Sequence, residues 1–150
     1  MAAITLLGGP MSQAHGMSTE TELRSLVERY AELVDQRKFD DLATVFCHDA
    51  VLQTGNGRRE GLGEIVAAMQ RLHRYRRTDH RVGSAVFTVD GPEGRGTVAC
   101  EAHHLDDEDR DRVMIITYHD RYLETPAGWR ICERTLEIHD DRIRADGSAC

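Results

Sequence analysis

Residues 112–124 read RVMIITYHDRYLE and residues 128–139 read GWRICERTLEIH, with a short turn between them. The first run is rich in Val, Ile, Thr and Tyr, and the second holds Trp, Ile and Thr, a composition that predicts β-strands. Two earlier runs, 80–89 and 96–105, have the same character. The segment 90–94 connects these two runs, and the acidic segment 106–109 leads from the second of them to residue 112; both consist of turn residues or solvated charges. Short connections between long strands predict an antiparallel meander of four strands.

The first half of the chain has a helical period instead. Residues 19–22 (TETE) fit a capping box, and apolar residues then recur at helical spacing to about Val34. The other predicted elements of this half are a short second helix with Phe39, Leu42, Val45 and Phe46 inward, a hairpin at 50–53 turning at 55–57, and a third helix from about Leu62 to Tyr75. Helices followed by strands predict an α+β fold, with the helices on one face of a curved sheet.

Size and charge restrict the class of protein. The chain has 150 residues, 40% of them hydrophobic, which predicts a single domain. Its net charge of -7 argues against a nucleic-acid-binding protein, which would carry a basic face. No run approaches the roughly 20 apolar residues that span a bilayer, and the N-terminus lacks the features of a secretory signal. We predict a folded domain at 19–140 between flexible tails at 1–18 and 141–150.

The four cysteines are Cys47, Cys100, Cys132 and Cys150. They are widely spaced and include no C-x-x-C pair. This spacing indicates neither a disulfide framework nor a structural zinc site, so we expect a reducing, cytoplasmic environment.

Asp35 and His80 are the leading candidates for chemistry. Asp35 follows the apolar stripe of the first helix, and His80 begins the first long strand. A carboxylate that orients an imidazole makes a general base near neutral pH, because unperturbed imidazole has a pKa of about 6.5. From its residue type alone, Asp35 is better explained as an exposed loop residue, like Asp40 and Asp41.

A second histidine lies one strand further on. A turn centred near 92–93 would place His80 opposite His104 or Leu105, within a residue or two of His103. Strand alternation makes His103 and His104 face opposite sides of the sheet, and the sequence leaves open which one points inward. The histidines that could bind zinc are His80, His103, His104 and His119. Their spacing presents no ligand set on one face, so we expect no metal.

Three residues of the last two strands remain. Alternation puts Tyr118 and Asp120 on one face of their strand, and Arg134 falls roughly opposite them across the next turn. Arg134 and Asp120 can therefore form a structural ion pair. Tyr30, in the first helix, is either a core residue with a hydrogen-bonded hydroxyl or a proton donor.

The order of elements resembles the SnoaL-like branch of the NTF2-like superfamily. The matching segments are Tyr30 to Asp35, 42–46 with 49–50, 61–65, 78–80, 118–120 and 128–134. The resemblance implies a cone in which about three N-terminal helices pack on a curved antiparallel sheet and enclose a pocket. It also implies a homodimer, with a trimer as the alternative.

The same resemblance suggests roles for individual residues. Relatives such as scytalone dehydratase, bile-acid 7α-dehydratase and hexachlorocyclohexane dehydrochlorinase pair an Asp and a His at the places of Asp35 and His80. By this likeness His80 is the proton acceptor, Asp35 orients it, and Tyr30 is a candidate proton donor. The polyketide cyclases of the branch use an acidic residue on a late strand, which corresponds to Asp120.

The expected function is therefore a cofactor-independent lyase or isomerase that acts on a small hydrophobic ring compound. A dehydratase, a dehydrohalogenase and a double-bond isomerase all fit this description. The alternatives are a polyketide-type cyclase that uses Asp120, and a non-catalytic binding or accessory protein. An apolar pocket of at least about 300 Å³ with His80 and Asp35 at its base would favour the first of these.

Overall fold

The structure is a computed structural model that describes residues 18–144. Residues 1–17 and 145–150, which make up most of the predicted tails at 1–18 and 141–150, lie outside the described residues. The elements are, in order, α2 (Thr19–Asp35), a 3-10 helix (Phe39–Thr44), β1 (Phe46–Thr54), β2 (Gly57–Glu60), α3 (Leu62–Met69), a second 3-10 helix (Gln70–Arg74), β3 (Arg77–Asp90), β4 (Glu93–Leu105), β5 (Asp111–Thr125) and β6 (Gly128–Arg144). The α+β class is confirmed.

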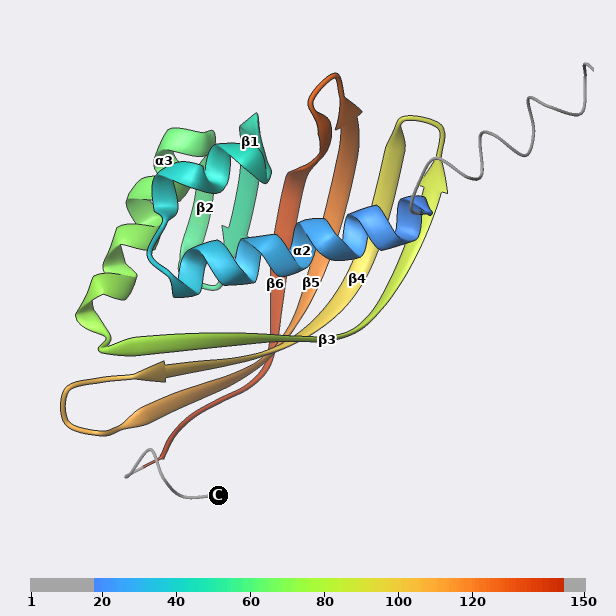
Figure 1. The fold of residues 1–150 in the computed structure, drawn as a ribbon. Coiled ribbons are helices and arrows are strands. Elements are labelled where there is room, and N and C mark those ends of the chain that lie inside the picture. The colour runs from blue at the N-terminus through green and yellow to red at the C-terminus, as the bar shows by residue number, and fades with distance from the viewer. Residues whose placement is uncertain (1–17, 145–150) are drawn as a thin grey trace, which may run out of the picture.

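One six-stranded sheet, in the order β2-β1-β6-β5-β4-β3, forms the body of the molecule (Figure 1). Strands β3 to β6 form the predicted antiparallel meander. The prediction of a purely antiparallel sheet is wrong at one edge, because β1 runs parallel to β6. These two strands are far apart in the sequence, so strand patterning gives no sign of their pairing or direction.

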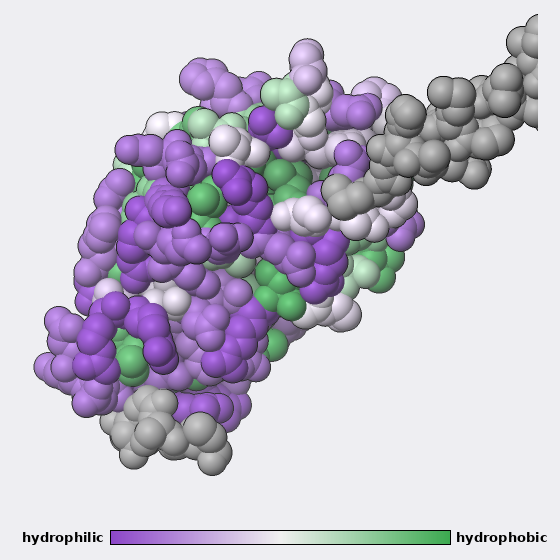
Figure 2. All heavy atoms as spheres, viewed as in Figure 1, coloured by the Kyte–Doolittle hydropathy of each residue, from purple (hydrophilic) through white to green (hydrophobic). Residues whose placement is uncertain are grey.

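Helix α2 lies across one face of the sheet, in front of β6, β5 and β4 (Figure 1). Its apolar side buries Leu23, Val27 and Val34, and the even-numbered residues of β4 face it from Val98 to Ala102. The capping prediction is off by one residue, since the Ser18 hydroxyl, 3.2 Å from the Thr21 N–H, caps the helix. The surface seen from this side is largely hydrophilic (Figure 2), which fits an amphipathic helix covering the core.

The register of β3 and β4 differs from the prediction by about two residues. His80 pairs with Ala102, and His104 pairs with Thr78. Two local features cause the difference: the turn is centred at 91–92, and a bulge places one extra residue of β3 opposite Ala99. Arg24 of α2 donates to the Gly83 carbonyl at this bulge over 2.6 Å, so the helix is anchored where the strand is irregular.

Element ends also differ from the predictions. The second helix is a short 3-10 helix, and the third becomes one after Met69. The hairpin turn is as predicted, with Thr54 paired to Gly57. Strand β6 continues to Arg144, past the predicted domain boundary at 140, because its last residues pair with the start of β5.

The cysteine prediction is wrong for one pair. Cys47 and Cys132 form a disulfide with their Cα atoms 5.0 Å apart, while Cys100 is buried and free. The two residues are 85 positions apart in sequence, but parallel pairing of β1 with β6 makes them neighbours. This disulfide removes the basis on which a reducing environment was predicted. None of the helices among the described residues has the length and apolar character needed to cross a membrane.

Candidate active site

The end of α2 and the start of β3 bring Asp35 and His80 into direct contact. The Nδ1 atom of His80 lies 2.7 Å from one Asp35 oxygen, and the His80 backbone N–H donates to the other oxygen over 2.8 Å. The Thr78 hydroxyl donates to the first oxygen over 3.0 Å. The His80 side chain is 7% exposed and the Asp35 side chain 23%.

These bonds determine where the protons lie. Burial raises the pKa of Asp35, but the hydrogen bonds from the His80 ring and backbone outweigh burial, and the pKa is lowered below its ordinary value. The carboxylate is therefore ionised at neutral pH and accepts from every donor around it. In neutral His80 the ring proton then resides on Nδ1, and Nε2 carries the lone pair. Among the described residues, Nε2 has no hydrogen-bond partner.

His104 is the histidine that points inward. Its ring lies 5.4 Å from that of His80 and 4.8 Å from that of Tyr75, and the residue is 6% exposed. Neither ring nitrogen has a partner among the described residues. Burial, together with the nearby His80, lowers the pKa of His104 to about 3, so the ring is neutral at physiological pH. It thus offers one donor and one acceptor, both unused.

His103 faces the other side of the sheet and is fully engaged there. Its Nδ1 lies 2.7 Å from Asp111 and its Nε2 lies 2.6 Å from Glu101. Burial lowers the pKa of His103, but the two carboxylates outweigh it and the pKa is raised. A ring held at both nitrogens has no free lone pair for base chemistry, so the arrangement does not favour His103 as a second catalytic histidine.

Asp120 and Arg134 form a buried pair inside the core. Arg134 donates to both Asp120 oxygens over 2.8 and 2.7 Å, and the Tyr122 hydroxyl donates to Asp120 over 2.8 Å. The Arg134 guanidinium lies 3.8 Å from the Tyr118 ring centre and 4.5 Å from that of Tyr30. Asp120 therefore has no free oxygen positioned for proton transfer to a substrate.

The two tyrosines are core residues. Tyr118 is 1% exposed and its hydroxyl lies 3.5 Å from the Cys100 sulfur. Tyr30 is 5% exposed, with its ring 6.4 Å from His80 in an edge-on arrangement. Burial raises the pKa of Tyr30, although Arg134 opposes this. Tyr30 is near enough to His80 to support the imidazole, but it lies on the side that the core fills.

The cavity beside His104 has a volume of about 570 Å³. Its lining residues are Arg74, Tyr75, His104, Asp106, Arg110, Arg112, Asp141 and Ile143. The expected apolar pocket with His80 and Asp35 at its base is not the arrangement found here, because the lining is mainly charged and includes neither of these two residues. The aromatic core fills the space behind the dyad, so the open volume lies toward the strand ends, where residues are polar.

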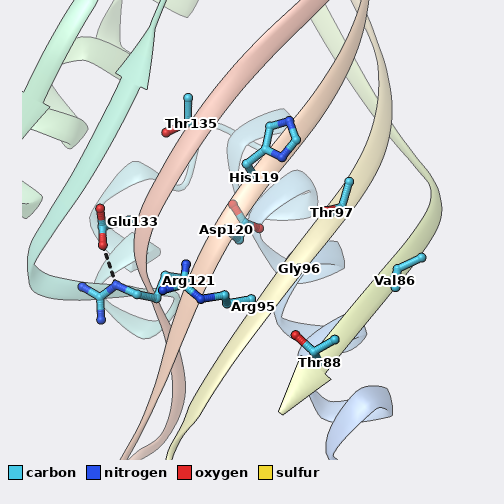
Figure 3. Close-up of a pocket in the computed structure, with 10 residues that line it drawn as sticks. All are labelled: Val86, Thr88, Arg95, Gly96, Thr97, His119, Asp120, Arg121, Glu133 and Thr135. Atoms are coloured by element: carbon cyan, nitrogen blue, oxygen red, sulfur yellow. Dashed lines mark hydrogen bonds and ion pairs between the residues drawn. The ribbon is translucent and has the colours of Figure 1, made fainter. Parts of the chain in front are cut away.

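A second cavity, of about 330 Å³, lies on the face of the sheet away from α2 (Figure 3). Arg95, Thr97 and His119 project from neighbouring strands there, and Arg121 is paired with Glu133. Figure 3 shows these side chains spread along the strands rather than converging on one point. Of the predicted site residues, only Asp120 borders this cavity, and its carboxylate is bound to Arg134.

Three residues in contact around Asp35 and His104 were not singled out from the sequence. Thr78 and Arg37 form hydrogen bonds around Asp35, and Tyr75 packs on His104. Their positions next to Asp35 and His80 in the chain were the available signal, since residues two apart on a strand share a face. Within residues 18–144 no group of three or more His, Cys, Asp or Glu side chains is arranged to bind a metal ion.

Comparison with known proteins agrees with this architecture. A family model described as a SnoaL-like domain matches residues 16–135. An uncharacterized protein of Mycobacterium tuberculosis is 30% identical over 125 residues, covering 79% of this chain and 84% of the relative, and one of Mycobacterium bovis matches equally.

Solved structures are similar in fold at lower identity. A hexachlorocyclohexane dehydrochlorinase from Novosphingobium barchaimii superposes with a TM-score of 0.76 at 15% identity, covering 85% of this chain and 90% of that one. A protein from Kribbella flavida gives 0.76 at 20% identity, covering 82% and 92%. At these identities the likeness establishes the fold.

Proposed function

Because the chain belongs to the SnoaL-like domain family, we propose that it is a cofactor-independent lyase or isomerase in which His80 removes a proton from carbon. The observation that carries the proposal is that both Asp35 oxygens accept hydrogen bonds from Thr78 and His80, while His80 Nε2 has no partner among the described residues. A fixed tautomer with a carboxylate behind it is the arrangement of a general base, because the carboxylate stabilises the imidazolium that forms.

In this proposal, His104 stabilises the negative charge that proton removal creates. Proton removal next to a carbonyl places negative charge on the carbonyl oxygen, and a neutral imidazole can donate a hydrogen bond to it. His104 is neutral and has a donor without a partner. The cavity that it lines also holds Arg74, which has no carboxylate partner among the described residues and whose positive charge favours such an oxyanion, whereas Arg110 and Arg112 are paired with carboxylates.

Access to His80 depends on the same ring. His104 lines the cavity, and its ring lies 5.4 Å from that of His80, which is not a lining residue. No hydrogen bond holds either His104 nitrogen to a described residue, so the ring turns without breaking one. A substrate of the proposed class is a small ring compound with an acidic C–H bond and an oxygen function, since an apolar ring alone would leave the buried His104 nitrogens without a partner.

The test uses 2-tetralone, a bicyclic ketone, and follows deuterium uptake at its α-carbon by proton NMR in heavy water. The wild type is expected to accelerate uptake over His80→Gln by about 10²- to 10⁴-fold, the usual contribution of a general base. His48→Gln, which removes an exposed histidine without described contacts, serves as the control and keeps the wild-type rate. Equal rates in wild type and His80→Gln would reject the proposal.

Chloride release from hexachlorocyclohexane is the second assay, chosen because the dehydrochlorinase is a structural relative. Elimination without uptake at the ketone favours a lyase, and uptake without elimination favours an isomerase.

A non-catalytic binding protein is the second candidate. It is favoured by one observation, that neither Asp35 nor His80 lines the cavity at His104. In that case a ring ketone binds, as detected by saturation-transfer NMR, and the uptake rate does not exceed that of His80→Gln.

A further inference from the structure

The turn that ends α2 places an arginine where glycine is usual. The Lys38 N–H donates to the Leu33 carbonyl over 2.9 Å and the Arg37 N–H to the Val34 carbonyl over 3.1 Å, which is the Schellman arrangement. Arg37 has a φ of 62°, in the left-handed region. A residue with a side chain is strained there relative to glycine, and the contacts made by the guanidinium offset that strain.

The guanidinium of Arg37 joins three segments around the dyad. One terminal nitrogen lies 2.7 Å from the Thr78 hydroxyl and 3.1 Å from the Val34 carbonyl. The other lies 3.1 Å from the Leu72 carbonyl and 3.5 Å from the Tyr75 carbonyl. The end of α2, the start of β3 and the second 3-10 helix are thereby held together.

The contact with Thr78 has a direction. A guanidinium can only donate, so the Thr78 oxygen accepts from Arg37 and its single proton is available for Asp35. Thr78 is 4% exposed and β-branched, so its hydroxyl has little freedom to turn elsewhere. The hydrogen bonds therefore form a chain with one direction: Arg37 donates to Thr78, and Thr78 donates to Asp35. The Asp35 oxygen that accepts from Thr78 also accepts from His80 Nδ1–H.

We propose that Arg37 is a positioning residue, whose guanidinium sets the direction of the Thr78 hydroxyl and so holds Asp35 in the orientation that fixes the His80 tautomer. Its catalytic consequence rests on the proposed function of His80. The positioning itself is independent of any substrate. The same guanidinium holds the Tyr75 backbone, and the Tyr75 ring packs on His104, so one side chain supports both histidines.

The experiment is a nitrogen-15 NMR measurement on the histidine side chains of the full chain, which needs no ligand. In the wild type the neutral His80 ring is expected to show a single tautomer protonated at Nδ1, with a slowly exchanging Nδ1 proton. Arg37→Gly removes the guanidinium, and glycine adopts the required φ freely, so the turn is preserved.

Two further variants separate positioning from general loss of structure. Thr78→Val keeps the shape and removes the hydroxyl, and Thr78→Ser restores a hydroxyl. Arg37→Gly and Thr78→Val are expected to speed exchange of the His80 Nδ1 proton about tenfold and to populate the other tautomer, the effect of one lost hydrogen bond of about 1.4 kcal/mol. Thr78→Ser and the control Lys38→Ala, next to Arg37, are expected to match the wild type.

A His80 ring that keeps the wild-type tautomer and exchange rate in both Arg37→Gly and Thr78→Val would overturn the inference. The uptake assay separates it from the proposed function. If His80 is the base, Arg37→Gly lowers kcat about 10- to 100-fold with KM little changed, as for loss of a residue behind a catalytic group. If His80→Gln has the wild-type uptake rate, the base assignment fails, while the NMR result still decides whether Arg37 positions the dyad.

Discussion

His80 donates to both oxygens of Asp35, through its backbone N–H to one and through its ring to the other. The backbone of β3 therefore fixes the carboxylate that in turn fixes the ring. A side chain held by the main chain of its own partner cannot rotate without breaking a strand-edge hydrogen bond. This relationship makes the tautomer of His80 a property of the fold.

Asp35→Asn is expected to abolish the basic Nε2 while preserving the fold. A carboxamide can turn its N–H₂ toward His80 Nδ1, which then accepts, and the ring proton moves to Nε2. Deuterium uptake by 2-tetralone should fall about 10²- to 10⁴-fold. Asp79→Asn, which removes the neighbouring carboxylate paired with Arg81, should not change the rate. A fully active Asp35→Asn protein would contradict the proposed role of the carboxylate.

His104 should make the protein sensitive to acid. Its pKa is about 3 in the folded state, whereas an unfolded histidine titrates near 6.5. Between these values the unfolded chain binds a proton that the native state does not, so unfolding becomes easier as pH falls, by at most about 1.4 kcal/mol per pH unit.

The measurement is urea unfolding at pH 7 and pH 5 of the wild type and of His104→Leu. The wild type should lose about 2 kcal/mol more of its free energy of unfolding than the variant over this interval. His48→Gln, lacking an exposed histidine instead, should follow the wild type. Equal losses in wild type and His104→Leu would show that His104 is not held neutral.

Removing one partner of the buried Asp120–Arg134 pair should lower the free energy of unfolding strongly, whereas replacing both partners with apolar residues should lower it little. Asp120→Asn leaves a buried guanidinium without its counter-charge, which typically costs about 3–5 kcal/mol. The double variant Asp120→Leu with Arg134→Met removes both charges and should recover most of that loss in thermal unfolding. If the double variant retains deuterium uptake, the pair is structural, whereas loss of uptake in a stable double variant would revive the cyclase alternative.

The Cys47–Cys132 disulfide should contribute substantially to stability. A closed loop of 85 residues removes unfolded-state entropy worth about 4–5 kcal/mol in the chain-entropy model. Cys47→Ser with Cys132→Ser is expected to lower the free energy of unfolding by about 2–5 kcal/mol. Thiol labelling of the denatured wild type should find two more reactive cysteines after reduction than before. An unchanged thiol count would disprove the bond.

Local patterns were enough to place the main elements. The apolar stripe of α2 and the β-rich runs of β3 to β6 each satisfy a periodicity that few other structures share, so fold class and family followed from them. The candidacy of Asp35 and His80 came from residue chemistry and family resemblance together. Their hydrogen bond is a fact of the structure, and their role in catalysis stays a prediction.

Pairing between distant segments was beyond the reach of the sequence. One extra residue at the bulge near Gly83 and an earlier turn made Ala102 the partner of His80, where His104 or Leu105 was predicted. Parity within β4 decided that His104 faces the core and His103 the far side, which no local pattern distinguishes. The parallel pairing of β1 with β6 likewise made Cys47 and Cys132 neighbours.

By itself, then, the sequence determined which segments are helices and strands and which side chains could carry proton-transfer chemistry, because both depend on neighbours along the chain. Only the tertiary structure decided which histidine lies next to His80 and that Asp120 is hydrogen-bonded to Arg134. It also decided that Thr78, which accepts from Arg37, donates to Asp35. These depend on register and on the path of the chain between elements, where a shift of one residue turns a side chain to the opposite face.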